Sequence, residues 1–280
     1  MAEFAKEAER PLFPRRKRDA HKGDFGRLFI LAGSRDYTGA PALCAHAALR
    51  TGAGLVTLAV PEDAWAVIAA KCPNETMVWP LPEKYDMIVK KASSCDVAVI
   101  GPGLGQGERA EQLVPSLLRD LKCPVILDAD GLNILAGHMN VLDEREGLTV
   151  LTPHEGEFAR LTGCSLPVAD RLSAARAFAI AHSCTLILKG YRTITAHPGG
   201  SCTVNTTGNP GMARGGSGDA LAGILGALLC QFGETALADG VWLHGRAGDL
   251  AAGDKGEYGM TVTDLIGQIP YAMKEVTEGE

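Results

Sequence analysis

The order of apolar segments along the chain predicts an α/β protein whose mostly parallel sheet is covered by helices on both faces. Short runs of consecutive apolar residues alternate with longer segments that carry helical periodicity. The short runs lack the polar alternation of a half-exposed strand, which indicates burial on both faces. Several runs lead directly into polar or glycine-rich sequences, and ligands of such sheets bind beyond the carboxyl ends of the strands. The functional residues are therefore expected where the predicted strands end.

The predicted elements follow one another in this alternating order. Apolar runs predict strands, some of which lead into loops, at residues 27–33, 55–60, 96–105, 124–131 and 185–190. Helical periodicity predicts helices at residues 40–54, 61–72, 110–121, 168–183, 218–232 and 234–252. Residues 148–163 predict a strand, a loop and a helix, and residues 192–206 predict a β-hairpin that turns at residues 198–200. Pro115 lies inside a predicted helix and indicates either a kink or a misplaced boundary.

A single domain is favoured because no internal repeat, low-complexity linker or shift in composition marks a boundary. We expect this domain over residues 21–280, after an N-terminal arm of residues 1–20. Residues 15–18 of the arm are all basic and either bind phosphate or form a solvated face. The arm has no apolar segment typical of a secretory signal, so we expect a cytoplasmic protein.

The composition argues against several classes of function. The formal net charge of −6 disfavours nucleic acid or an anionic membrane as the main partner. The apolar helical run at residues 220–232 is too short to span a bilayer. The eight cysteines lie far apart without a CxxC pair, which predicts reduced thiols rather than disulfides or a metal cluster.

The segment GGSGD, residues 215–219, precedes a long apolar helix. Glycines at a helix start let backbone N–H groups approach an anion, and the helix dipole adds positive potential there. The Asp219 carboxylate would repel phosphate, but it can accept a proton from a hydroxyl group that attacks phosphorus. The alternative is that Ser217 or Asp219 caps the helix. No lysine follows the glycines as in a Walker A loop, and GPGLGQG at residues 101–107 lacks the spacing of a dinucleotide fingerprint.

Other candidate residues stand at the remaining strand ends. Gly103 and Gly105 suit either a loop whose backbone touches a ligand or a plain strand-to-helix turn. His154 stands at a helix start as a candidate hydrogen-bond donor to a substrate, and no second histidine follows with zinc spacing. Lys189 ends an apolar strand and either meets an anionic partner or extends to solvent.

Acidic residues also follow two of the strands. Asp128 and Asp130, with Asn133 beyond them, either organise Mg²⁺ through water or, in the case of Asp130, cap a helix. The glutamates after His154 either support a site or only complement the helix N-terminus. The identity of any metal ligands stays unknown at this level.

The segments HKGDFGRLFILAGSRDYTGAPALCAHAALRTGAGLVTLAVP, GPGLG, VILDADGLNIL, LTPHEGEFARL, LKGYRT and NPGMARGGSGDALAGILGALL follow one another in this order. In sequence and order they resemble the ADP-dependent NAD(P)H-hydrate dehydratases of the ribokinase-like superfamily. The resemblance extends from about His21 to the last helices. TPHEGEF and NPGMARGGSGD together are specific to this family. The resemblance implies a ribokinase-like fold without the lid of typical sugar kinases.

The family acts in nicotinamide nucleotide repair. The resemblance implies that the S form of hydrated NADH or NADPH is dehydrated back to NADH or NADPH, and that ADP yields AMP and phosphate. ADP, or alternatively ATP, is the implied co-substrate, together with Mg²⁺. Some bacterial members of the family carry an epimerase domain in front of this one, and we expect 280 residues to be too few for it, so the chain looks like the stand-alone dehydratase. The resemblance also implies a homotetramer and a separate epimerase for the hydrates.

The resemblance assigns site residues position by position. Ala40, Gly103 and His154 match positions that contact the hydrated nicotinamide nucleotide. Asp219 matches both a substrate-contacting position and the catalytic base of the superfamily. The adenine nucleotide is assigned to Gly218 and to the turn of Lys189, Gly190, Tyr191, Arg192 and Thr193.

Two other functions stay open. A small-molecule kinase of the same superfamily, such as a hydroxymethylpyrimidine or thiazole kinase, would release a stable phosphorylated product. A non-catalytic nucleotide-binding regulator would not need a base beside the phosphate, so Asp219 argues against it. The pair TPHEGEF and GPGLG favours the dehydratase over the kinase.

Overall fold

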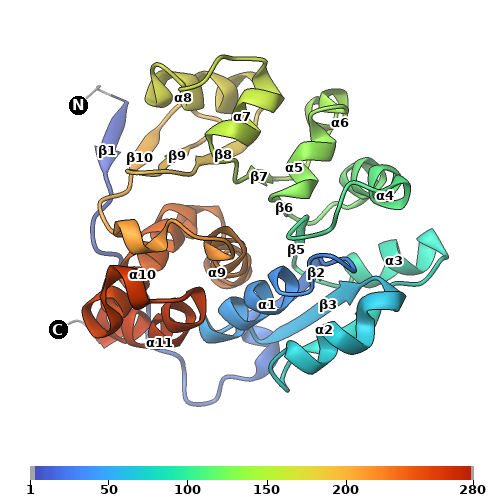
Figure 1. The fold of residues 1–280 in the computed structure, drawn as a ribbon, viewed down its shortest axis with the longest axis horizontal. Helices are drawn as coiled ribbons and strands as arrows, with labels where there is room; N and C mark the ends of the chain where they lie inside the picture. The colour runs from blue at the N-terminus through green and yellow to red at the C-terminus, as the bar shows by residue number, and fades with distance from the viewer. Residues whose placement is uncertain (1–3, 279–280) are drawn as a thin grey trace.

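A ten-stranded sheet forms the centre of the molecule, with helices packed on both of its faces (Figure 1). The computed structural model describes residues 4–278. The strands are β1 (Ala5–Glu7), β2 (Arg27–Leu31), β3 (Leu55–Val60), β4 (Met77–Pro80), β5 (Val97–Ile100), β6 (Val125–Leu127), β7 (Thr149–Leu151), β8 (Thr185–Leu188), β9 (Ile194–Ala196) and β10 (Cys202–Val204). Their order across the sheet is β1-β10-β9-β8-β7-β6-β5-β2-β3-β4.

The strands from β8 to β4 in this order are all parallel, whereas β9 is antiparallel to both of its neighbours. Parallel strands that are buried on both faces explain the continuous apolar runs of the sequence. Their carboxyl ends meet at one edge of the sheet, and the loops that leave this edge carry the candidate site. The predicted α/β fold with a mostly parallel sheet is confirmed.

The helices form two layers. They are α1 (Ala40–Arg50), α2 (Trp65–Lys71), α3 (Tyr85–Ala92), α4 (Glu108–Asp120), α5 (Asp130–Leu135), α6 (Met139–Asp143), α7 (Glu155–Thr162), α8 (Arg171–Ala181), α9 (Ser217–Phe232), α10 (Leu237–Gly259) and α11 (Val262–Glu278). Short 3₁₀ helices are η1 (Lys22–Phe25), η2 (Glu62–Ala64), η3 (Pro210–Met212) and η4 (Glu234–Ala236). One face of the sheet packs on α1, α2 and α9, and the other on α3 to α8.

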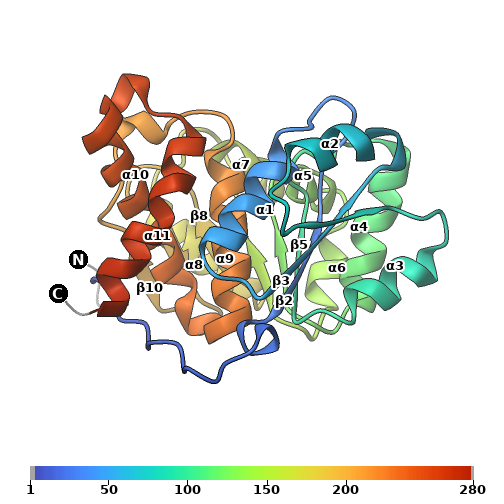
Figure 2. The ribbon, with the colours of Figure 1, turned by 90° about the horizontal axis from the view of Figure 1, so that it is seen from below.

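The last two helices form an outer layer, which joins the sheet cluster through Leu237 and Val241 at the start of α10. α10 and α11 pack against α1 and α9 through a separate apolar cluster that includes Ile224, Leu243 and Leu265 (Figure 2). α9 is therefore buried between the sheet and this outer layer, which explains why it is apolar nearly all round. A Cβ on Gly223 of α9 would lie 2.1 Å from the carbonyl oxygen of Cys44, so glycine allows α9 to approach α1 closely.

Most predicted elements are present, with differences at their boundaries. The predicted strand at residues 124–131 ends at Leu127, and α5 already begins at Asp130. α4 continues through Pro115, so neither a break nor a new boundary is needed there. The hairpin of β9 and β10 is confirmed. Among residues 4–278, the strands and α-helices that were not predicted from the sequence are β1, β4, α3, α5, α6 and α11.

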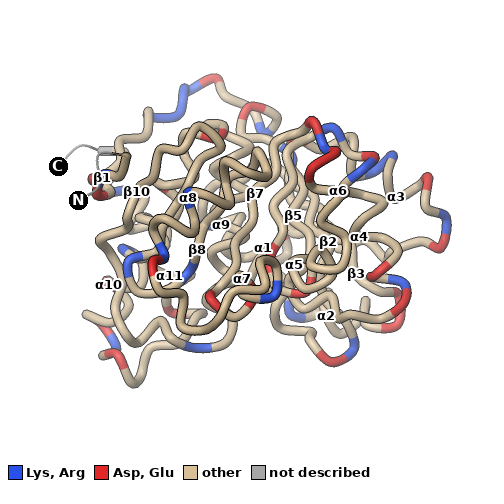
Figure 3. Tube along the Cα trace, turned by 90° about the horizontal axis from the view of Figure 1, so that it is seen from above, with Lys and Arg blue, Asp and Glu red and all other residues tan. Residues whose placement is uncertain are grey.

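The N-terminal arm packs on the domain. β1 pairs in parallel with β10 at the edge of the sheet. The ring of Phe13 stacks on Phe232 with centroids 4.8 Å apart. Residues 15–18 are exposed, in agreement with a solvated basic face, and the Arg16 guanidinium lies 3.6 Å from the ring centroid of Phe25. Basic and acidic residues are otherwise interspersed along the chain (Figure 3).

Candidate functional site

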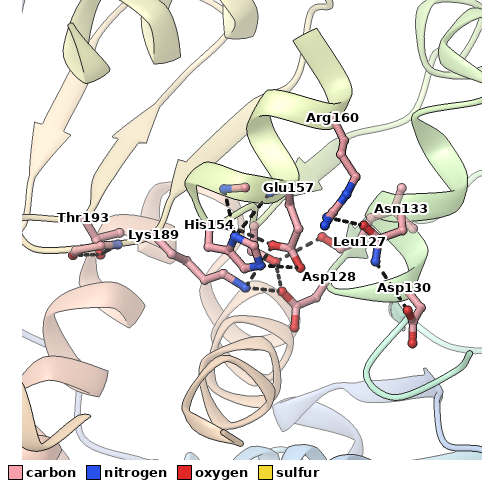
Figure 4. A network of polar contacts seen from close by, with 12 residues as sticks. Leu127, Asp128, Asp130, Asn133, His154, Glu157, Arg160, Lys189 and Thr193 are labelled. Carbon is pink, nitrogen blue, oxygen red and sulfur yellow. Dashed lines mark hydrogen bonds and ion pairs between the residues drawn. The ribbon is translucent and has the colours of Figure 1, made fainter. Parts of the chain in front are cut away.

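Acidic and basic side chains from several strand ends meet near the start of α9 (Figure 4). Asp128 follows β6, Lys189 follows β8, and Glu157 lies in the first turn of α7. Lys189 Nζ lies 2.7 Å from Asp128 Oδ1 and 3.7 Å from Glu157 Oε2. The carboxylate side chains of Asp128 and Glu157 are only 2% and 6% exposed, so solvent screens these ion pairs weakly. Lys189 therefore meets anionic partners rather than extending to solvent.

The protonation of Lys189 reflects a competition between burial and charge. Burial alone would lower the pKa of the Lys189 ammonium, because it disfavours the charged form. The negative charges of Asp128 and Glu157 outweigh that effect, and the pKa of Lys189 is raised above its ordinary value. The site thus holds a permanent cation at neutral pH.

Asp219 lies in the first turn of α9. Gly216 immediately precedes this helix with φ of 97°, and a Cβ there would lie 2.6 Å from Leu43 Cδ1, so glycine lets the helix start pack on α1. Burial, followed by the negative charge of Asp128, raises the pKa of Asp219 to about 7. A carboxyl group with this pKa exchanges its proton near neutral pH, which suits a general base.

The two proposed caps of α9 are not formed. The residue at the cap position is Gly216, and no side chain accepts a capping hydrogen bond there. The prediction that Ser217 or Asp219 only caps the helix is therefore wrong. The side chain of Ser217 instead lies with its hydroxyl oxygen 3.4 Å from Nε2 of the buried His244 on α10.

Gly218 and Lys189, both predicted to bind the adenine nucleotide, lie against each other. A Cβ on Gly218 would be 3.2 Å from Lys189 Nζ and 3.8 Å from Asp128 Oδ2. The bare backbone of Gly218 therefore leaves the lysine ammonium next to the first turn of α9, where backbone N–H groups have no helical partner. A fixed cation and a helix N-terminus together favour a phosphate group.

The other predicted nucleotide contacts form a turn between β8 and β9. Tyr191 is exposed at its tip, and Thr193 Oγ1 donates a 2.9 Å hydrogen bond to the carbonyl oxygen of Gly190. Arg192 adopts φ of 56° and forms an ion pair with Glu7 of β1. The turn is thus tied to the N-terminal strand.

Arg171 of α8 holds this turn through hydrogen bonds to its backbone. Its guanidinium donates to the carbonyl oxygens of Tyr191 at 2.7 Å, and of Leu188 and Lys189 at 3.1 Å each. Its Nε lies 3.0 Å from Glu155 Oε1 on α7. The sequence reasoning missed Arg171, because an arginine at a helix start shows no pattern that reveals contacts to a distant turn.

Ala40 and Gly103, both predicted to contact the hydrated nucleotide, also lie together. Gly103 has φ of 59°, and a Cβ there would be 2.8 Å from Tyr37 Cβ and 3.0 Å from Ala40 Cβ. Gly101 has φ of 125°, and a Cβ there would be 1.9 Å from the carbonyl oxygen of Asp128. The glycines of GPGLG therefore let this loop pass closely over the turn that follows β6 and reach the start of α1.

His154 lies at the N-cap of α7. Its Nδ1 accepts hydrogen bonds from the backbone N–H groups of Gly156 at 3.0 Å and Glu157 at 3.2 Å. A ring nitrogen that accepts carries no proton, so the neutral ring carries its proton on Nε2, which lies 3.4 Å from Glu157 Oε1. The side chain is 55% exposed, which leaves the ring accessible to a ligand.

Asp130 and Asn133 serve the local structure. Asp130 Oδ2 accepts a 2.9 Å hydrogen bond from the backbone N–H of Gly105, and Oδ1 accepts one of 3.1 Å from Gln106. Asn133 Oδ1 accepts from Arg160 of α7 at 2.9 Å (Figure 4). Asp130 does not cap α5, whose cap position is Ala129, so this alternative is wrong.

Potential metal ligands, helix lengths and cysteines also bear on the function. Among residues 4–278, no group of three or more histidine, cysteine, aspartate or glutamate residues is arranged to hold a metal ion. None of the helices in the described part of the chain is both long and apolar enough to cross a membrane. All eight cysteines are free thiols, of which Cys44, Cys95, Cys184 and Cys202 are buried.

The chain resembles curated proteins over nearly its whole length. It is 42% identical to the bifunctional NAD(P)H-hydrate repair enzyme Nnr of Moorella thermoacetica over 96% of this chain and 53% of that protein. It is 34% identical to the ADP-dependent (S)-NAD(P)H-hydrate dehydratase of Bacillus subtilis over 97% of both chains. The chain thus spans about half the length of the bifunctional relatives that it matches.

Solved structures agree with this result. A ribokinase-like superfamily protein from Enterococcus faecalis superposes with a TM-score of 0.86 at 28% identity, over 99% of this chain and 98% of that one. The Bacillus subtilis ADP/ATP-dependent NAD(P)H-hydrate dehydratase co-crystallised with ATP and Mg²⁺ gives a TM-score of 0.82 at 32% identity, over 95% of each chain. These matches confirm the ribokinase-like fold.

The family model described as NAD(P)H-hydrate dehydratase matches residues 28–271. This range includes Ala40 and Gly103 near the start of α1 as well as Lys189 and Asp219 near the start of α9. The residues brought together by the fold therefore lie within the part of the sequence that the model describes, and the chain belongs to the NAD(P)H-hydrate dehydratase family.

Proposed function

We propose that this protein catalyses the ADP-dependent dehydration of the S form of hydrated NADH and NADPH, and that it releases NADH or NADPH, AMP and phosphate. The observation that carries the proposal is the half-buried Asp219 with a pKa of about 7, in the first turn of a helix that glycines precede and beside the cation of Lys189. Family membership and the full-length similarity to the Bacillus subtilis dehydratase support the same activity.

The first step makes the leaving group. Hydroxide leaves poorly, so the ring hydroxyl oxygen attacks the terminal phosphorus of ADP while Asp219 accepts the hydroxyl proton. The new P–O bond replaces the bond to the departing AMP. The ammonium of Lys189 and the N–H groups at the start of α9 stabilise the charge on the transferred phosphoryl group.

The second step restores the dihydropyridine. The ring nitrogen donates its electron pair, the C–O bond breaks, and phosphate leaves with the bonding electrons. Loss of a proton from the neighbouring ring carbon to solvent then restores the double bond. Ala40, Gly103 and His154 are proposed to hold the hydrated nucleotide, with the Nε2–H of His154, whose side chain is 55% exposed, as a donor. Gly218 and the turn Lys189, Gly190, Tyr191, Arg192 and Thr193 are proposed to hold ADP.

Magnesium enters this proposal with the nucleotide. The described side chains do not fit a resident ion, because no group of three possible ligands is assembled among residues 4–278. Mg²⁺ commonly binds proteins through substrate phosphates and water rather than through a dedicated cage. We propose that the nucleotide phosphates carry Mg²⁺ into the site, and no step above relies on a protein ligand for it.

The remaining features rest on the resemblance. We propose one catalytic domain over residues 21–280 with an N-terminal arm of residues 1–20, whose first three residues lie outside the described part of the chain. We further propose a cytoplasmic homotetramer that cooperates with a separate epimerase for the hydrates. ADP is the proposed co-substrate, with ATP as the alternative.

A direct assay tests the activity. Hydrated NADH is incubated with ADP or ATP, with and without Mg²⁺, and the near-ultraviolet absorbance of the dihydronicotinamide is followed. We expect absorbance to return with one phosphate released per NADH. A stable phosphorylated product without returning absorbance would instead indicate a kinase, and binding without turnover would indicate a regulator.

A further inference from the structure

Asp128 is a buried carboxylate that the proposed reaction does not use. Its Oδ1 accepts hydrogen bonds from Lys189 Nζ and from the hydroxyl of Thr152, both at 2.7 Å. The side chain of Asp128 is 2% exposed, and Thr152 is also buried. The two bonds come from the ends of β8 and β7, so Asp128 is fixed by two neighbouring strands. Figure 4 shows the contact between Asp128 and Lys189.

The backbone after Asp128 is also unusual. Ala129 has φ of 48° and ψ of −116°, a conformation that costs free energy for a residue with a Cβ. This turn lets β6 end at Leu127 and α5 begin at Asp130, with Asp128 between them. Strain of this kind persists where the surrounding structure requires a particular placement of side chains.

Lys189 is anchored by two carboxylates and lies beside the first turn of α9. Its Nζ lies 2.7 Å from Asp128 and 3.7 Å from Glu157, and it is 3.2 Å from where a Cβ on Gly218 would be, while the charge of Asp219 also acts on it. The long lysine side chain is flexible when it is not anchored, and ordering it costs conformational entropy. Asp128 provides the shorter and more buried of the two anchors.

We propose that Asp128 is a positioning residue, which holds the Lys189 ammonium beside Gly218 so that one fixed cation faces the phosphoryl group as it leaves the nucleotide. This inference rests on the proposed function, in which phosphoryl transfer occurs at the start of α9. The Thr152 hydroxyl orients the Asp128 carboxylate, and Asp128 acts only through Lys189 and through its charge. A cation that is already in place requires no reorganisation during the transfer.

The charge of Asp128 also acts on Asp219. Burial raises the pKa of Asp219 most, the charge of Asp128 raises it further, and Lys189 lowers it by a smaller effect. The charged or titratable groups that affect or lie near Asp219 come from different elements: Asp128, Asp130, Glu157, Lys189, Cys44 of α1 and, through Ser217, His244 of α10. Because the effect of Asp128 exceeds that of Lys189, removing the Asp128 charge lowers the pKa of Asp219 even when the lysine moves.

The test compares Asp128→Asn with Thr152→Val. We expect kcat of Asp128→Asn to fall about 10–100-fold at pH 8, because a misplaced catalytic group costs rates of this order. The loss should be smaller at acidic pH, since the acid limb of the kcat profile moves below the wild-type value of about 7. Thr152→Val keeps both charges, so its acid limb should stay where it is in the wild type. Unchanged kcat, or a lower kcat with an unmoved acid limb, would overturn the proposal.

A second variant covers the case in which Asp128→Asn does not fold. Lys189→Met alone leaves a buried unpaired carboxylate, whereas Lys189→Met with Asp128→Asn removes the whole ion pair. If Asp128 acts through Lys189, the double variant should lose no more kcat than Lys189→Met. Independent, multiplied losses would contradict the proposal.

A measurement without turnover separates this inference from the proposed function. The carboxyl carbon of Asp219 is followed by NMR in ¹³C-aspartate-labelled protein and is assigned with Asp219→Asn. Its pKa should fall in Asp128→Asn but not in Thr152→Val. An inactive wild type with this shift would refute the proposed activity alone, and an active wild type without it would refute the role of Asp128 alone.

Discussion

Gly103 and Ala40 approach so closely that a methyl group on Gly103 would lie 3.0 Å from Ala40 Cβ. Gly103 also has φ of 59°, which costs a residue with a Cβ about 1–2 kcal/mol. Gly103→Ala should therefore destabilise the protein and push the β5 loop away from α1. We expect a raised KM for hydrated NADH with little change in KM for ADP.

Gly105 offers a matched control for this change. It has φ of 76°, but a Cβ there would meet nothing nearer than 3.8 Å. Gly105→Ala should show a similar loss of thermal stability without the rise in KM for the hydrate. If Gly103→Ala and Gly105→Ala have equal KM values for hydrated NADH, the contact of Gly103 with α1 does not matter for substrate binding.

The acidity of Asp219 predicts the pH dependence of the reaction. The base must be unprotonated, so kcat of the wild type should rise with pH and level off above about 7. Below that value kcat should fall about tenfold per pH unit. Asp219→Asn should fold and bind both ligands but lose nearly all turnover, by roughly 10²–10⁴-fold or more. Wild-type turnover in this variant would exclude Asp219 as the base.

The same pKa predicts an effect on stability. The folded protein holds the Asp219 proton more tightly than the unfolded chain, with a pKa of about 7 against an ordinary value of 3.8. This contribution to stability is fully present below about pH 4 and is lost as the pH rises through 7. Asp219→Asn should therefore unfold at a higher temperature than the wild type at pH 8, and the difference should shrink towards pH 4.

Asp264 provides a control, because its pKa is shifted in the opposite direction from that of Asp219. Hydrogen bonds from Thr261 lower the pKa of Asp264 in the folded protein, so its contribution is present at neutral pH and is lost on acidification. Asp264→Asn should thus destabilise the protein at pH 8 and have less effect at acidic pH. Thermal unfolding followed by circular dichroism between pH 4 and 8 measures the effect of each variant on stability. If the effects of Asp219→Asn and Asp264→Asn change with pH in the same direction, the opposite pKa shifts of the two carboxyl groups are refuted.

Arg171 should control nucleotide binding through the β8–β9 turn, to which its three hydrogen bonds run. Arg171→Met removes three hydrogen bonds to the backbone of the β8–β9 turn, so KM for ADP should rise about tenfold while KM for the hydrate stays. Arg176 lies on the same helix but donates to the carbonyl oxygen of Gly200 in the β9–β10 turn. Arg176→Met should leave KM for ADP unchanged. A comparable rise in both variants would indicate a general effect on α8.

His154 combines two roles that a pair of variants can separate. Its Nδ1 caps α7, and loss of a cap costs about 1 kcal/mol, so His154→Ala should lower both stability and hydrate affinity. His154→Asn retains a capping acceptor but lacks the ring Nε2–H. We expect it to recover most of the stability while KM for the hydrate stays high. Recovery of both would mean that His154 acts only as a cap.

The sequence allowed the parallel core to be predicted because each buried strand is apolar throughout. It also pointed to Asp219 and Lys189, which stand directly at element ends. Arg171 and Thr152 could not be predicted, since their partners lie in other segments and become neighbours only in the folded sheet. Ala129 was missed for a similar reason: its strained backbone lies in the turn that Gly101 approaches after β6, and no local preference of alanine predicts it.

The pairing of β1 with β10 affects how readily the protein can aggregate. β10 would be the outermost strand of the sheet without residues 5–7, and its backbone N–H and C=O groups would face solvent. Such an open edge is a template for intermolecular strand pairing and aggregation. A fragment that begins at residue 21 would also lose Phe13 from its stack on Phe232. β1 covers this edge of β10 with a strand of only three residues, which leaves a much shorter edge, and shortened versions of the protein should keep residues 4–20.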